Sequence, residues 1–162
     1  NMVRIFKMAK FPIVCSNYDF AGTELASIVK PYVVLKRKGL KIGVFGLGPE
    51  LAGLVTEANY GPIKYLDPIA KAKEMTEILK KKEKCDVIIC ISHLGWKIDG
   101  IDDSEVAPAT RDIDLILGGH SHTYFQQLEF LNNLDGKPVP VDQNGKSAIW
   151  VGKMTLDIVK NK

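Results

Sequence analysis

The sequence predicts an α/β fold whose sheet is mixed and ends in an antiparallel tail. A helical pattern that begins at Asp67 and reaches Leu79 is followed directly by an apolar strand over 86–92. A second unit repeats this order, with a short helix over 103–110 and a buried strand over 113–117. Helices that alternate with short, continuously apolar strands are typical of α/β proteins. We therefore expect a layered sheet with helices packed against it.

The first part of the chain supplies one helix and three strands. Apolar residues recur three or four positions apart over 2–9, which predicts a helix. Short runs rich in β-branched residues at 11–17, 32–35 and 42–47 predict strands. Gly39, in the segment 38–41, favours a tight hairpin turn between the second and third strands, because glycine tolerates a positive φ.

The clearest helix has recognisable signals at both ends. Asp67 is placed to accept hydrogen bonds from the free N–H groups of the first turn, and Pro68 suits the first helical position. The lysines at 80–82 stand near the other end, where positive charge complements the helix dipole. We interpret them as a solvated helix terminus and not as a nucleic-acid patch.

The last third of the chain changes character. The nearly unbroken apolar run at 87–91 predicts a strand buried on both faces. Beyond it, β-like runs at 124–130, 139–141, 148–151 and 154–159 are separated by turn sequences, and they predict antiparallel strands that close the sheet. Because no internal repeat or linker interrupts the pattern, we expect one domain over 1–162 and no second domain.

Composition excludes several classes of protein. The chain has 162 residues, of which 46% are hydrophobic and 25% charged, as in an ordinary globular domain. Its net charge of 22 − 19 = +3 is too small to indicate a nucleic-acid or membrane partner. The apolar runs are far shorter than the roughly 18 residues of a spanning helix. Cys15, Cys85 and Cys90 form no C-x-x-C pair, and we expect buried, reduced thiols.

The three histidines carry most of the functional information. His93 directly follows the strand at 86–92, and His120 and His122 follow the strand at 113–117 after two glycines. Open α/β sheets bind their ligands at the carboxyl ends of strands, and neutral imidazole is the commonest protein metal ligand. Two histidines two positions apart on an extended segment can point the same way. We therefore predict a metal site formed by His93, His120 and His122.

Other candidate sites are weaker. The glycines at 43–48 fail the dinucleotide pattern, because position 51 is leucine and Pro49 intervenes. Ser121 lacks the G-x-S-x-G context of a nucleophile. The acidic segment with Asp99, Asp102, Asp103 and Glu105 is interpreted as a solvated loop, and Asn17 and Asp19 as turn caps at a strand end.

Several motifs together resemble a known family. The segments 11–20, 30–32, 39–47, 91–95 and 113–123, above all Ser-His-Leu-Gly at 92–95 and Gly-His-Ser-His-Thr at 119–123, are similar to the calcineurin-like metallophosphoesterase domain of bacterial 5′-nucleotidases and UDP-sugar hydrolases. The likeness runs over almost the whole chain. It implies the C-terminal half of a four-layer α/β/β/α sandwich.

The resemblance also implies a chemistry. In such a domain His93 and His120 would bind one divalent ion and His122 its neighbour, with manganese or zinc as the expected metals. Two ions would clamp the phosphate oxygens of a nucleotide, a UDP-sugar or a related phosphate ester and activate a water molecule. The family is often periplasmic or secreted, and the compartment of this chain stays open.

The family's earlier motifs, D-x-H, G-D and G-N-H-[DE], have no counterpart here. The resemblance therefore assigns no catalytic acid to this chain, and we expect it to be inactive alone. A bare half-domain would expose an apolar sheet face, which predicts self-association that covers this face. Two alternatives remain open: a self-contained site in which the three histidines bind one zinc ion, and a metal-free binding module on the same scaffold.

Overall fold

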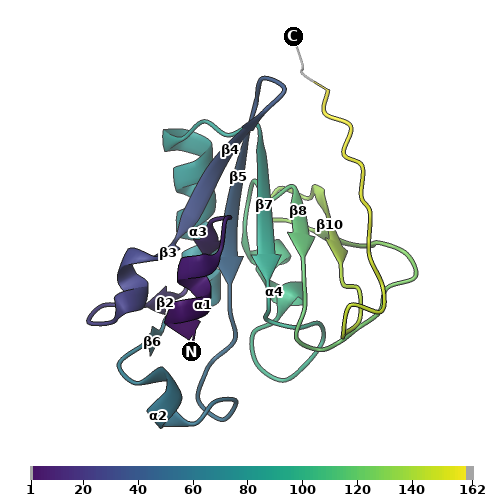
Figure 1. Cartoon of the computed structure of the whole chain (residues 1–162). Helices are drawn as coiled ribbons and strands as arrows, with labels where there is room; N and C mark the ends of the chain where they lie inside the picture. The colour runs from purple at the N-terminus through teal and green to yellow at the C-terminus, as the bar shows by residue number, and fades with distance from the viewer. Residues whose placement is uncertain (1, 160–162) are drawn as a thin grey trace.

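The computed structural model describes residues 2–159 and is built around a six-stranded mixed sheet (Figure 1). The strand order is β4-β5-β7-β8-β10-β9. These strands are β4 (Tyr32–Arg37), β5 (Leu40–Leu47), β7 (Val87–Ser92), β8 (Leu115–Leu117), β9 (Glu129–Asn132) and β10 (Pro138–Asp142). Strands β5, β7, β8 and β10 run parallel to one another, and the two edge strands β4 and β9 are antiparallel to their neighbours. The predicted mixed α/β class is confirmed.

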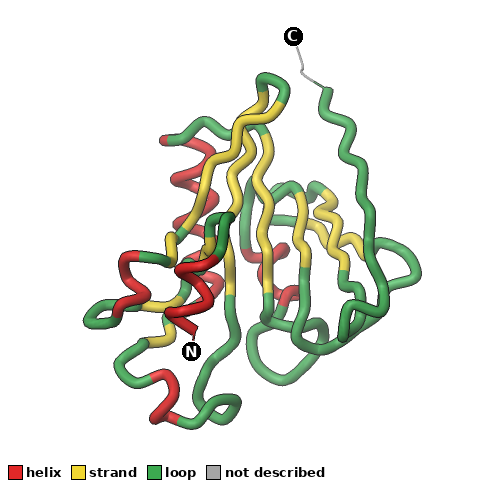
Figure 2. Tube along the Cα trace, in the orientation of Figure 1, coloured by secondary structure: helices red, strands yellow, loops and turns green. Residues whose placement is uncertain are grey.

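Helices and two small strand pairs complete the fold. The helices are α1 (Met2–Met8), the 3₁₀ helix η1 (Glu24–Ser27), α2 (Glu57–Tyr60), α3 (Pro68–Glu77), the π-helical turn η2 (Ile78–Lys82) that continues α3, and α4 (Asp103–Ala109). Strand β1 (Ile13–Val14) pairs in parallel with β3 (Val29–Lys30), and β2 (Tyr18–Asp19) pairs antiparallel with β6 (Lys64–Tyr65). Figure 2 shows that loops connect most of these elements and form the last described segment, residues 148–159.

The core lies between one face of the large sheet and the helices α3 and α4. Apolar side chains at alternate strand positions, such as Phe45, Ile88 and Ile116, are fully buried there with Leu79 and Val106 from the helical layer. Alternation sends these side chains to one face because successive strand residues point to opposite sides. Their burial supplies the apolar contact that holds the parallel strands in register.

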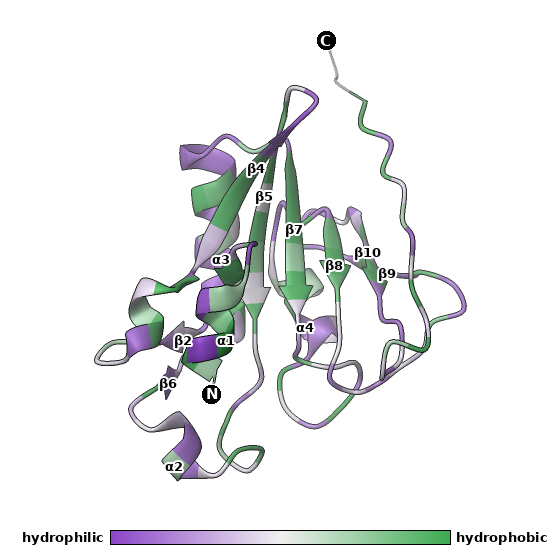
Figure 3. Cartoon of the chain, viewed as in Figure 1, coloured by the Kyte–Doolittle hydropathy of each residue, from purple (hydrophilic) through white to green (hydrophobic). Residues whose placement is uncertain are grey.

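The opposite face of the sheet is largely open. Ile91 on β7 is 40% exposed and Leu117 on β8 is 37% exposed, whereas their neighbours Cys90 and Ile116 are fully buried. In Figure 1 α3 and α4 lie behind the sheet, and Figure 3 shows hydrophobic residues along β5, β7 and β8. The prediction that the 86–92 strand is buried on both faces is therefore wrong, because the packed helices cover one face only.

The predicted elements of the first two thirds are confirmed in place. Strands β4 and β5 form the expected hairpin, with Arg37 opposite Leu40, and Gly39 in its turn has φ +80°. The Asp67 carboxylate accepts a hydrogen bond from the Ala70 N–H at 2.8 Å, as expected of a helix cap. Asp103 begins α4 within the predicted range, and the lysines after α3 are exposed.

The tail differs from its prediction. Only β9 and β10 form there, and β10 pairs in parallel with β8, so the strand that joins the tail to the sheet is not antiparallel. Residues 148–159 contain no strand. Their β-branched and aromatic composition favours an extended backbone, but a strand also needs a partner, and Ile149, Trp150 and Val151 lie 69%, 53% and 90% exposed.

Two further observations concern the cysteines and the length of the helices. Cys85 and Cys90 are buried and Cys15 is partly buried, and all three are free thiols. Across residues 2–159, every helix is too short or too polar to cross a membrane.

The Asp67 cap makes a measurable contribution to stability. We expect Asp67→Ala to lower the free energy of unfolding by about 1 kcal/mol, because the Ala70 N–H loses its acceptor. Asp67→Asn, which keeps an acceptor oxygen, serves as the control and should lose only a few tenths. Urea denaturation measures both changes, and equal stability of Asp67→Ala and the parent chain would contradict this role.

Candidate metal centre

The three histidines lie at the carboxyl ends of two neighbouring parallel strands. His93 follows β7, and His120 and His122 follow β8 after two glycines. The strands pair with Ile91 opposite Leu117, so both end at the same edge of the sheet. As a result the rings of His93 and His120 lie with their centroids 5.2 Å apart and their planes at 62°.

Gly119 makes this approach possible. A Cβ atom built on Gly119 would lie 2.9 Å from Nδ1 of His93, closer than real side chains come. Any larger residue at this position would displace the His93 ring from its place. The close packing of the His93 ring therefore explains why glycine, and not a larger residue, occupies position 119.

The loop that carries the other two histidines is not extended. His120 has φ +77° and His122 has φ +57°, both in the left-handed region. Within the loop, the Ser121 N–H donates to the Gly119 carbonyl at 3.0 Å. The expectation that an extended segment aligns the two side chains is wrong. Left-handed backbone in residues with a Cβ costs roughly 1–3 kcal/mol each, which the surrounding contacts must offset.

The electrostatics of the site favour a neutral His93 ring. Partial burial lowers the pKa of His93, and the neighbouring His120 and His122 lower it further because a second positive charge nearby is unfavourable. A neutral ring keeps a lone pair on one nitrogen, which is the form that binds metals.

The His93–His120 pair fits a divalent transition metal as two of its ligands. Two imidazoles on one tetrahedral ion, with Zn–N bonds of about 2.1 Å, place their ring centres about 5 Å apart. The observed 5.2 Å matches that spacing. Among residues 2–159, however, no three His, Cys, Asp or Glu side chains form a metal-binding group. The alternative of a self-contained three-histidine zinc site thus has no assembled ligand set in the described part of the chain.

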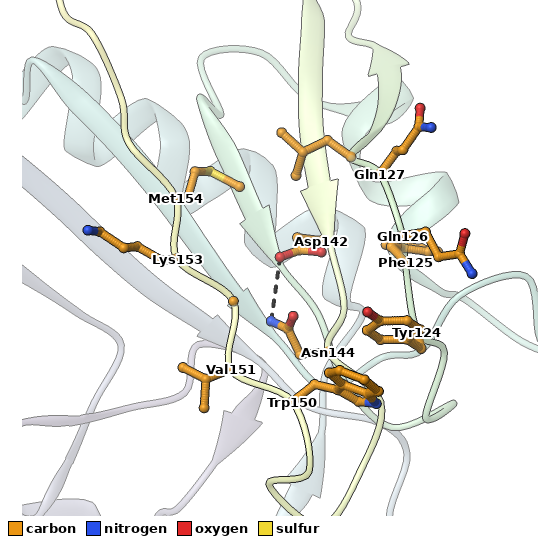
Figure 4. Close-up of a pocket in the computed structure, with 12 residues that line it drawn as sticks. Tyr124, Phe125, Gln126, Gln127, Asp142, Asn144, Trp150, Val151, Lys153 and Met154 are labelled. Atoms are coloured by element: carbon orange, nitrogen blue, oxygen red, sulfur yellow. Dashed lines mark hydrogen bonds between the residues drawn. The ribbon is translucent and has the colours of Figure 1, made fainter.

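Two hollows lie near the histidine loops. One has a volume of about 400 Å³, and His120, Tyr65, Glu50 and Asp99 contribute to its lining. The other, of about 280 Å³, is formed by the segment after His122 and by the tail. Figure 4 shows this second hollow, where Tyr124 stacks on Trp150 with ring centroids 4.8 Å apart.

The interpretation of the acidic segment as a solvated loop is wrong for two of its members. Asp102 is 3% exposed, and its carboxylate accepts hydrogen bonds from the N–H groups of Ser104 and Ile98 at 2.7 and 2.9 Å. Asp103 is fully buried. Asp102 therefore caps α4 and fixes the loop that precedes it, whereas Asp99 and Glu105 are exposed as expected.

Asn17 and Asp19 have different roles from each other. Asp19 is the expected turn cap, since its carboxylate accepts from the Ala21 N–H at 2.9 Å. The fully buried Asn17 instead donates to the Gly48 carbonyl at 2.7 Å and accepts from the Gly48 N–H at 2.8 Å. Asn17 thereby ties the loop after β5 to the loop after β1, and its interpretation as a turn cap is wrong.

Sequence reasoning assigned no role to Gln143 and misplaced Asp103, two polar residues beside the site. Gln143 is 1% exposed and its side-chain carbonyl accepts hydrogen bonds from the Ser121 hydroxyl and the Thr123 N–H, both at 3.0 Å. Asp103 lies beneath the same loop, next to Gly118. The signal for Gln143 was available: it continues the inward alternation of Val139 and Val141.

Asp103 makes the stability of the fold depend on pH. Burial raises its pKa to about 7, with the Ser92 hydroxyl opposing and the Asp102 carboxylate adding to the shift. Because the folded pKa lies above the unfolded value, the folded state binds the extra proton between about pH 4 and pH 7. We expect the free energy of unfolding to fall over this range as pH rises, by up to about 1.4 kcal/mol per pH unit.

Asp103→Asn should remove this slope, and Asp99→Asn, at an exposed carboxylate, should keep it. Urea denaturation at several pH values measures the slopes. Parallel slopes in Asp103→Asn and the parent chain would exclude Asp103 as the titrating group, and Asp114, a second carboxyl whose pKa is raised by burial, would then be examined next.

Comparison with known proteins finds phosphoesterases and 5′-nucleotidases among the relatives, although no family model matches the chain. The trifunctional nucleotide phosphoesterase YfkN of Bacillus subtilis is 32% identical over 93% of this chain. The 5′-nucleotidase of Vibrio cholerae is 36% identical over 70% of this chain. The chain spans only 11% and 22% of the lengths of these two proteins.

Solved structures agree with the sequence relatives. The 5′-nucleotidase precursor of Thermus thermophilus has a TM-score of 0.77 and 28% identity, and the match covers 88% of this chain and 29% of that one. The calcineurin-like phosphoesterase YfkN of Bacillus subtilis has a TM-score of 0.68 and 25% identity over 86% of this chain and 48% of its own. In sequence and fold, the chain is a homologue of a segment of the calcineurin-like 5′-nucleotidase family of metallophosphoesterases.

Proposed function

We propose that this chain contributes to a divalent-metal phosphoesterase that hydrolyses nucleotides or related phosphate esters, UDP-sugars included. The observation that supports this proposal most strongly is the approach of His93 and His120 to 5.2 Å across two parallel strand ends. The proteins it resembles are named as nucleotide phosphoesterases and 5′-nucleotidases, which favours the same class of substrate.

In this proposal His93 and His120 bind one metal ion and His122 binds a second. Manganese or zinc suits such a site, since both accept imidazole together with carboxylate ligands. When bound, a pair of divalent ions supplies Lewis-acid stabilisation of the phosphate and a more acidic water.

The residues of the chain itself have three tasks. His93, kept neutral by its surroundings, presents a nitrogen lone pair. Gly119 leaves the space that lets its ring stand beside that of His120. The half-buried His120 also borders the 400 Å³ hollow, which is large enough to admit part of a substrate beside the metal.

Catalysis by the isolated chain should be negligible. Within the described residues no carboxylate joins the histidines in a ligand group, so nothing there would bridge two ions or hold them firmly. No general acid is assigned to this chain to protonate the leaving oxygen. The complete reaction then depends on groups that the histidines alone do not supply.

Metal binding provides the direct test. We expect calorimetric titration with Zn²⁺ or Mn²⁺ to detect weak binding that falls at least about tenfold, or ~1.4 kcal/mol, in His93→Ala and in His120→Ala. Lys97→Ala, at an exposed residue in the same loop, should bind as the parent does. Hydrolysis of a nucleoside monophosphate should stay at background throughout.

Equal affinity in the parent and both histidine variants would sink the proposed site. Binding of one ion per chain that is lost in His122→Ala as well, accompanied by hydrolysis, would instead favour the self-contained three-histidine centre. Circular dichroism of each variant ensures that a lost site is not a lost fold.

We also propose that a second copy of the chain covers the open sheet face. Exposed apolar side chains on adjacent parallel strands, Ile91 and Leu117, form the middle of that face. A contiguous apolar patch of this kind promotes association in water.

Light scattering tests this association. The parent chain should show a mass above that of the monomer that increases with concentration, and Ile91→Lys should shift it towards the monomer. Lys36→Glu, which changes charge on the exposed end of β4, is the matched control and should leave the mass unchanged. A monomeric parent at high concentration would refute the association.

A further inference from the structure

Three residues form a row across the covered face of the sheet just beneath the histidine loops. The pairing of Ile91 with Leu117, and of Leu117 with Asp142, places Ser92, Gly118 and Gln143 side by side one position further along. In each strand this position belongs to the side that faces α3 and α4, as Gln143 shows by following the buried Val139 and Val141.

The register of β10 separates two environments. Asp142 and Asn144 face the hollow in Figure 4, where their side chains are joined by a hydrogen bond of 3.4 Å. Gln143, between them, points to the opposite side and is 1% exposed. A neutral amide in a core position is costly unless its polar atoms find partners.

One end of the Gln143 amide is fully used. Its Oε1 atom accepts from the Ser121 hydroxyl and from the Thr123 N–H, both at 3.0 Å. The Ser121 hydroxyl also accepts from the Trp96 N–H at 3.1 Å. Gln143 therefore connects the loop of His120 and His122 with the loop that follows His93.

The other end of the amide has no partner, and neither has the buried carboxylate of Asp103, which borders the same glycine, Gly118. Gln143 Nε2 and both oxygens of Asp103 are buried side-chain atoms without a hydrogen bond of ordinary length, and the Ser92 hydroxyl lies only near enough to lower the pKa of Asp103. A Cβ atom built on Gly118 would overlap Asp103 Oδ2 and lie 3.2 Å from Gln143 Nε2. A donor without an acceptor and an acceptor without a donor thus border the same glycine.

We propose that Asp103 and Gln143 are positioning residues, which pair across Gly118 and hold the two histidine loops at the separation that metal binding needs. The Gln143 amide donates to the Asp103 carboxylate through one buried water. Gly118 is required because any side chain there would occupy the space between them. The link to metal binding rests on the proposed function, whereas the link to loop geometry does not.

The pairing connects helix, sheet and site. Asp103 is the first residue of α4, and its N–H donates to the Gly95 carbonyl at 3.0 Å in the loop after β7. Through the pair, the first residue of α4 is linked to Gln143 at the end of β10, and through Gln143 to the loop after β8. The positions of these three segments, which are distant in sequence, then determine the positions of the histidines.

An exchange of donor and acceptor tests the pair. Gln143→Glu keeps the oxygen that accepts from Ser121 and Thr123 but sets a carboxylate against Asp103. The double variant Asp103→Asn with Gln143→Glu restores one donor and one acceptor in reversed order. Measurements near pH 8.5 prevent a shared proton from joining the two acids in the single variant, and Gln127→Glu, at an exposed glutamine, controls for added charge.

The first readout is amide hydrogen exchange of Thr123, whose N–H is held by Gln143. The second is calorimetric affinity for Zn²⁺. We expect Gln143→Glu to lose roughly 10- to 100-fold in Zn²⁺ affinity, as for other residues that orient metal ligands, together with Thr123 protection. The double variant should recover both, and Gln127→Glu should change neither.

The possible results separate the two proposals. Unchanged Thr123 protection and Zn²⁺ affinity in Gln143→Glu would overturn the pairing, as would a loss that the double variant does not recover. A parent chain that binds no Zn²⁺, while Thr123 protection still falls and recovers, would refute the proposed metal site and leave the pairing standing. If Gln143→Glu does not fold, Gly118→Ala, which inserts a methyl between the partners, should reproduce the loss of Thr123 protection, and full protection there would overturn the pairing.

Discussion

Parallel pairing of β7 with β8 is the constraint on which the site depends. Parallel neighbours end at the same edge, so the residues that follow them meet although they are far apart in sequence. The fully buried Cys90 and Ile116 stand opposite each other in this pair and anchor its register in the core. A shift of one residue would turn every side chain of β8 to the other face and separate His120 from His93.

The two faces of the sheet have different consequences for function. The face packed against α3 and α4 contains the apolar core, and its last row is polar, with Ser92 and Gln143 on either side of Gly118. This polar row lies where the strands stop and the histidine loops begin. At this edge, hydrogen-bonding side chains of the core contact the histidine loop, as Gln143 contacts Ser121 and Thr123. A change in core packing near Gln143 would therefore alter the geometry of the loop.

Local signals predicted much of this fold, and non-local pairing explains the rest. The cap at Asp67, the Gly39 turn and the strand at 87–92 are properties of short segments, and each was found where its residues place it. The residues at 148–159 have strand composition but no partner strand, which composition does not reveal. Likewise the exposure of Ile91 depends on which face of the sheet the helices cover, and an apolar run in the sequence does not identify that face.

The site shows the same division. Strand ends followed by His93, His120 and His122 were sufficient to predict that these residues follow strands that end at one edge of the sheet, and the rings of His93 and His120 lie side by side there. The loop is held by hydrogen bonds to Gln143, and Asp103 is buried next to Gly118, and in both cases the partner is distant in sequence. The role of Asn17 was hidden for the same reason, since its partner Gly48 is 31 positions away.

The backbone of the histidine loop has a conformation that lowers stability when histidine occupies it. At φ +77° and +57°, glycine or asparagine would be the more comfortable occupants, yet the chain places imidazoles there. A laboratory selection for thermostability alone would therefore tend to replace His120 and His122 and to remove the candidate site while stabilising the fold. Heat tolerance is a misleading guide in directed evolution of this loop, and libraries that vary it need a screen for ligand binding from the first round.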